Sequence, residues 1–131
     1  MKFKVVYWFA AIGYSFIILL ISHQTKPLPM LKPLFSYDKL IHLVEYGFFT
    51  FFWWMAAATT WSSMDRRFPL WIFLFSFFFA LSDEFHQSFI PGRDASWLDV
   101  TADFIGMVLV IGWMRYRQRI RCIEEANCED S

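Results

Sequence analysis

The chain has too few polar and charged residues for a soluble domain of its length. Of its 131 residues, 57% are hydrophobic, 22% are aromatic and only 18% are charged. A soluble domain this small must cover a large surface with polar groups. Net charge is lacking as well, because 12 Lys and Arg residues balance 12 Asp and Glu residues. That balance argues against a nucleic-acid partner, and the composition indicates a membrane protein.

Two further absences restrict the chemistry. The sequence contains no HExxH or similar metal-binding spacing, so no metal site is predicted and the cofactor stays open. Carboxylates and histidine are nevertheless residue types that hold divalent cations. The two cysteines, Cys122 and Cys128, lie close together near the end of the chain. We expect them to be free thiols, neither a metal site nor a disulfide.

The apolar residues form four runs, each with roughly the 20 residues needed to cross a hydrocarbon core of about 30 Å. The predicted transmembrane helices occupy about residues 5–22, 36–60, 68–89 and 96–117, and 118–131 form a short cytoplasmic tail. The first run begins like a signal peptide, but it is long for one and no small-x-small cleavage site follows, so a retained helix is favoured over cleavage. The predicted fold class is therefore all-α, a bundle of four transmembrane helices over residues 1–117.

The distribution of basic residues predicts the orientation of this bundle. With four spans, both chain termini lie on one side of the membrane. That side carries eight basic residues and the other side carries four. Because basic residues concentrate on the cytoplasmic side, both termini are predicted to be cytoplasmic, and loops 22–37 and 90–96 to face outward. The eight are Lys2, Lys4, Arg66, Arg67, Arg115, Arg117, Arg119 and Arg121; the four are Lys26, Lys32, Lys39 and Arg93.

Polar residues gather at the outer ends of the last three predicted helices. The segment LSDEFHQSFIPGRDASWLDV at 81–100 holds four carboxylates, a histidine, a glutamine and an arginine between two apolar runs. Helical spacing stacks Glu84 on Gln87, and Asp99 on Asp103. Asp103 lies about 9 Å into its helix from Trp97 at 1.5 Å per residue, too deep to face lipid cheaply.

The second predicted helix enters from the same side with its own polar set. Asp38, His42 and either Glu45 or Tyr46 fall on one stripe of this helix, and Lys39 lies beside them. Ionisable groups inside a membrane almost always face one another or a polar cavity. We therefore expect the polar residues of three helices to meet in the interior of the bundle, in its outer half.

Two motifs within these stretches resemble those of a known family. The pattern DKxxHxxxY at 38–46, followed by SDExxQxFxPGRxxSxxD at 82–99, is similar to the VanZ-like family. These are small bacterial membrane proteins named for an accessory protein of glycopeptide (teicoplanin) resistance. The resemblance covers residues 38–106, although the family usually has Asn in place of Asp103. The matched positions are Asp38, Lys39, His42, Tyr46, Asp83, Glu84, Gln87, Pro91, Gly92, Arg93, Ser96, Asp99 and the small residue Gly106.

The resemblance implies a multi-pass protein of the bacterial cytoplasmic (inner) membrane and a place in the cell envelope, but it supplies no established reaction. From the residues, His42, Glu84 and Asp99 are the candidate catalytic groups, because crowded carboxylates in a medium of low dielectric constant share a proton for acid–base chemistry. The ligand-binding candidates are Asp38, Lys39, Tyr46, Asp83, Gln87, Arg93 and Asp103.

Arg93 and Lys39 are suited to an anion, since arginine clamps phosphate or carboxylate with two hydrogen bonds. Arg93 is equally suited to an ion pair with Asp94 or Asp99 that locks the turn. The expected partner is a membrane lipid or a lipid-linked envelope precursor, and a homo-oligomer is possible.

Three function classes stay open at this point. The first is a membrane protein that binds an amphipathic envelope ligand and alters glycopeptide susceptibility without catalysis. The second is a membrane enzyme that hydrolyses or transfers a group on a lipid-linked substrate. The third, a proton or ion pathway, is the least favoured, because the inner halves of the last two helices, FLFSFFF and MVLVIGW, offer no polar relay.

Overall fold

The computed structural model describes residues 2–23, 38–61, 65–91 and 96–129. These residues form four α-helices: α1 (Lys2–Ser22), α2 (Asp38–Ala58), α3 (Phe68–Gln87) and α4 (Trp97–Glu129). No strand occurs within these ranges. All four helices are long and apolar enough to cross a membrane. The predicted all-α bundle of four transmembrane helices is confirmed.

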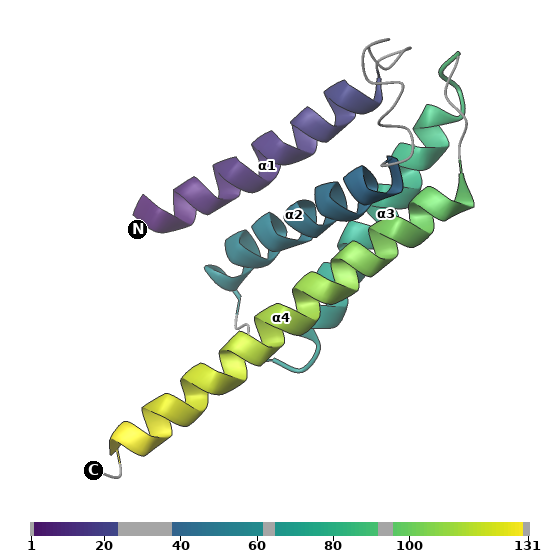
Figure 1. Cartoon of the computed structure of the whole chain (residues 1–131). Coiled ribbons are helices and arrows are strands. Elements are labelled where there is room, and N and C mark those ends of the chain that lie inside the picture. Colours follow the sequence, from purple (N-terminus) through teal and green to yellow (C-terminus); the bar gives the residue numbers. More distant parts are fainter. Residues whose placement is uncertain (1, 24–37, 62–64, 92–95, 130–131) are drawn as a thin grey trace.

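Successive helices run in opposite directions, so that both chain ends lie at the same end of the bundle (Figure 1). At the other end, α1 and α3 finish and α2 and α4 begin; we call this the polar end. Helix α2 is central, because it packs against α1, α3 and most extensively against α4. The stretches 38–46 and 82–99, distant in sequence, are thereby brought to one end of the molecule.

The helix boundaries follow from local sequence. Helix α3 has Pro69 in its first turn, where the missing backbone N–H is not needed. Helix α4 is capped by Ser96, whose Oγ accepts a hydrogen bond from the N–H of Leu98 at 3.2 Å. Helix α4 is longer than the predicted span 96–117, since it continues unbroken to Glu129. After Gly112 the sequence contains no Gly or Pro and is rich in helix-forming residues.

Two apolar clusters form the core. The cluster beneath the polar end includes Phe49, which is fully buried and stacks on Phe79 at a ring-centroid distance of 4.5 Å. This layer of packed side chains lies directly below the polar residues. The first cluster contains Ile18, Tyr46, Phe49, Ala80 and Met107, and the second contains Trp54, Ala57, Phe68, Ile72 and Met114.

Helices α2 and α4 cross with their backbones in contact at Gly106. A Cβ atom there would overlap the carbonyl oxygen of Leu43 and would lie 3.2 Å from the backbone nitrogen of Gly47. Only glycine fits such an approach. At Gly112 of the same helix, by contrast, a Cβ would meet nothing within 4 Å.

Candidate functional site

Asp83 ties three helices together at the polar end. Its Oδ2 accepts hydrogen bonds from Ser22 Oγ of α1 at 2.8 Å and from Tyr46 Oη of α2 at 3.1 Å. A third bond comes from Gln87 Nε2, one turn along α3, at 3.0 Å. The Asp83 side chain is only 3% exposed, and its other oxygen, Oδ1, has no hydrogen-bond partner among the described residues. One carboxylate oxygen of Asp83 thus holds the helices together, and the second oxygen can still accept a hydrogen bond.

A second buried contact joins α2 to α4. His42 Nδ1 lies 3.2 Å from Asp103 Oδ1. Both side chains are buried, and Asp103 is only 1% exposed. The carboxylate accepts a hydrogen bond from Nδ1–H and thereby fixes the orientation of the imidazole ring. Asp103 therefore has a definite partner in this chain.

Glu84 of α3 and Asp99 in the first turn of α4 make the contacts at the start of α4. Glu84 Oε1 accepts a hydrogen bond from the backbone N–H of Ser96 at 2.5 Å, which ties α3 to the first turn of α4. Asp99 Oδ1 lies 3.6 Å from Lys39 Nζ of α2. The Asp99 side chain is buried, whereas that of Lys39 is 52% exposed, so this ion pair lies at the edge of the site.

These contacts converge on one acidic site. Glu84 is close enough to interact electrostatically with His42, Asp99 and Asp103, and Asp103 interacts in the same way with Asp83. The structure thus brings together all three candidate catalytic residues, from three different helices. Their chemical roles stay predictions. Among the described residues, no three His, Cys, Asp or Glu side chains are grouped as metal ligands.

A groove leads to Glu84 from the outside of the bundle. It has a volume of about 320 Å³ and lies between α3 and α4. Glu84 and two serines provide the polar part of its lining, and the remaining lining residues are apolar. Phe85 and Trp97, both largely exposed, stand on its two sides. The groove is lined by Leu81, Glu84, Phe85, Ser88, Ser96, Trp97 and Val100.

Comparison with protein-family models gives a match over residues 3–118 to the family described as VanZ/LLP1. The chain belongs to the VanZ/LLP1 family. The match extends beyond the residues 38–106 that carry the sequence resemblance and includes α1. Neither curated proteins nor solved structures gave a match.

Most of the positions that match the VanZ-like motifs take part in the buried contacts. Two candidates are not placed: Arg93 lies outside the described residues, and the side chain of Asp38, which begins α2, does too. An anion clamp formed by Arg93 and Lys39 therefore stays a prediction. The described part of that clamp, Lys39, is engaged with Asp99.

Sequence reasoning did not identify the contribution of α1 to this VanZ-like site. Ser22 donates to Asp83 and accepts from Gln87 Nε2 at 3.2 Å. Its neighbour His23 forms a ring-to-ring contact with His86 of α3, with 3.3 Å between Nδ1 and Nε2. The available signal was the polar run SHQT that ends the first apolar span. Its described residues, Ser22 and His23, lie at the polar end of the bundle.

Proposed function

We propose that this VanZ/LLP1 protein is an integral membrane protein of the bacterial cell envelope that binds an amphipathic or lipid-linked ligand at the polar end of α2, α3 and α4. The observation that carries the proposal is the position of Glu84. This buried carboxylate lies at the polar part of an otherwise apolar groove of about 320 Å³ between two helices long enough to span a membrane. A ligand with a polar head and an apolar chain matches both parts of that groove.

The charge of the site indicates which polar head it favours. Among the described residues, four buried carboxyl groups face one partly exposed lysine and one histidine. Oδ1 of Asp83 has no hydrogen-bond donor among the described residues, and Oδ1 of Asp99 has only the Lys39 ammonium beside it at 3.6 Å. Buried acceptors are stabilised when a donor reaches them. We therefore infer that the ligand head donates hydrogen bonds, through hydroxyl or ammonium groups. The four carboxyl groups are those of Asp83, Glu84, Asp99 and Asp103.

The excess of basic residues at the end of the bundle with both termini supports a cytoplasmic location for that end, and therefore an outward-facing polar end. In a bacterial inner membrane, a site with this orientation would lie on the side where lipid-linked envelope precursors are exposed to the outside. An effect on susceptibility to glycopeptides such as teicoplanin is the cellular consequence that the family resemblance implies. The apolar layer around Phe49 beneath the site favours a closed binding site over an ion pathway.

Acid–base hydrolysis or group transfer on such a ligand is the second candidate function. It is favoured by the orientation of His42, which Asp103 holds from behind at 3.2 Å while Glu84 lies within electrostatic range. An imidazole positioned by a carboxylate is a common arrangement for a general base. Both candidate functions require the same ligand, and they differ in whether the protein converts that ligand chemically.

Mass spectrometry of lipids that co-purify with the protein tests the proposal. Glu84→Gln keeps an oxygen that can accept the N–H of Ser96 but removes the charge. We expect a lipid that is enriched with the wild type to be lost from Glu84→Gln. It should be retained by Glu124→Gln, which removes the same charge at an exposed position far along α4. Equal enrichment in all three proteins would refute the binding site.

The same lipid then separates binding from catalysis. Incubated with purified protein, it should remain intact if the protein only binds it. If the protein is an enzyme, the wild type should convert it and His42→Ala should not, while His42→Ala still retains the lipid. A thermal unfolding curve for each variant shows whether it is folded.

A further inference from the structure

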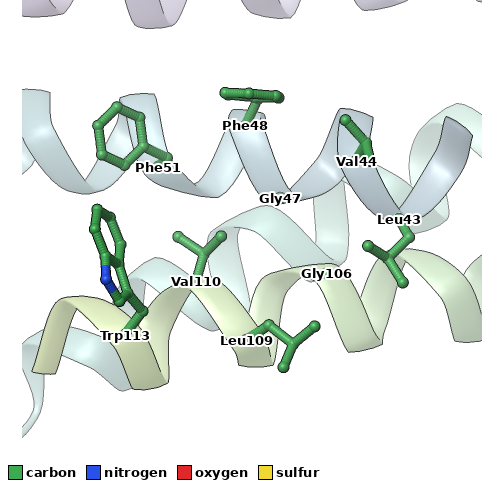
Figure 2. Close-up of a pocket in the computed structure, with 9 residues that line it drawn as sticks. All are labelled: Leu43, Val44, Gly47, Phe48, Phe51, Gly106, Leu109, Val110 and Trp113. Carbon is green, nitrogen blue, oxygen red and sulfur yellow. The ribbon is translucent and has the colours of Figure 1, made fainter. Parts of the chain in front are cut away.

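A second groove lies on the outer surface of α2 and α4, away from Glu84. It has a volume of about 410 Å³, and none of its lining residues carries a charge. The groove arises where Gly47 and Gly106 bring the two helices together without side chains, between larger flanking residues (Figure 2). Its lining consists of Leu43, Val44, Gly47, Phe48, Phe51, Gly106, Leu109, Val110 and Trp113.

The end of this groove nearer the chain termini has a positive charge beside it. Phe51 and Trp113 face each other there, with ring centroids 6.2 Å apart. The guanidinium of Arg117, one turn further along α4, lies 5.8 Å from the centroid of the Trp113 ring. From Trp97 to Arg117 the helix rises about 30 Å, the thickness of a bilayer hydrocarbon core. If Trp97 lies at one boundary, Arg117 lies at the depth of the opposite headgroups.

We propose that this groove holds an acyl chain of an anionic phospholipid whose phosphate is bound by Arg117. An apolar hollow within a membrane-spanning surface suits a hydrocarbon chain, and a basic residue at headgroup depth attracts anionic lipid. Arg117 is exposed and already held beside the groove by its contact with Trp113. The phosphate and the chain of one lipid would thus meet their partners about one helical turn apart.

A second copy of the chain is the less suitable occupant. Helices associate in membranes through small residues that let their surfaces meet flush. Here the small residues Gly47 and Gly106 are already used within the chain, for the crossing of α2 and α4. What remains outside is a hollow between bulky, half-exposed side chains such as Phe48 and Leu109. A flexible chain can fill that shape more readily than a rigid helix.

Native mass spectrometry tests this site on the full chain, released from nanodiscs of equal phosphatidylglycerol and phosphatidylcholine. We expect the wild type to retain one phosphatidylglycerol. Leu109→Trp, which fills the groove, should lose it. The matched control Val108→Trp, also on the exposed surface of α4 but outside the groove lining, should keep it. Val44→Trp fills the groove from α2 and serves if Leu109→Trp does not fold.

The charge is tested separately by Arg117→Gln against Arg119→Gln, which removes an exposed arginine on another side of α4. Retention should fall about five-fold for Arg117→Gln, the ratio for about 1 kcal/mol per basic residue near a lipid surface, and remain unchanged for Arg119→Gln. Equal retention of the two lipids by the wild type would overturn the proposal. Equal retention of phosphatidylglycerol by Leu109→Trp and Val108→Trp would also overturn it. So would the detection of a dimer that only the groove-filling variants abolish.

Discussion

Replacement of Gly106 by alanine gives the sharpest test of how α2 and α4 are held together. The new Cβ would overlap the carbonyl oxygen of Leu43, 3.0 Å from the Leu43 carbonyl carbon and 3.2 Å from the backbone nitrogen of Gly47. These are backbone atoms in the middle of a helix, so no rotamer change can relieve the clash. The two helices must separate. Overpacking of this kind costs about 1–3 kcal/mol, and we expect the upper part of that range.

Gly112 on the same helix supplies the control, because a Cβ there meets nothing within 4 Å. Gly112→Ala should gain up to about 1 kcal/mol from helix propensity, so the free energies of unfolding of the two variants should differ by about 3 kcal/mol. Unfolding in detergent, followed by circular dichroism against added SDS, measures this difference. Equal stability of the two variants would refute the backbone contact.

Two further predictions concern the polar end. Asp83→Leu removes the acceptor of three buried hydrogen bonds and should lower the free energy of unfolding by at least ~2 kcal/mol. Asp83→Asn, which keeps one acceptor oxygen, should lower it less, and Ser82→Ala, at an exposed position, should change it little. A double-mutant cycle of Lys39→Gln and Asp99→Asn should give a coupling of about 0.2–1 kcal/mol, because one partner is half exposed. A coupling well above that range would mean that the pair is buried more deeply than the structure shows.

The sequence was sufficient for the number of helices, because each apolar run alone meets the length required by a bilayer. It was also sufficient to predict that Glu84, Asp99 and Asp103 lie near one another. Helical periodicity and the cost of placing charge in lipid leave these side chains few other arrangements. The sequence was not sufficient to predict the contact of Ser22 with Asp83, because that contact depends on how α1 packs against α3. Nor could it distinguish Gly106 from Gly112, because a glycine is informative only once the opposing backbone is known.

The neighbouring acids Asp83 and Glu84 of α3 are predicted to have different roles, Asp83 in holding the bundle together and Glu84 in binding the proposed ligand. Successive residues of a helix point about 100° apart, so the two carboxylates face different helices. Asp83 faces α1 and α2, and its Oδ2 accepts one hydrogen bond from each of them and a third from Gln87 of α3 itself. Glu84 faces the first turn of α4, beside the groove. Removing the first should therefore loosen the bundle, whereas neutralising the second should leave the bundle intact and change what it binds.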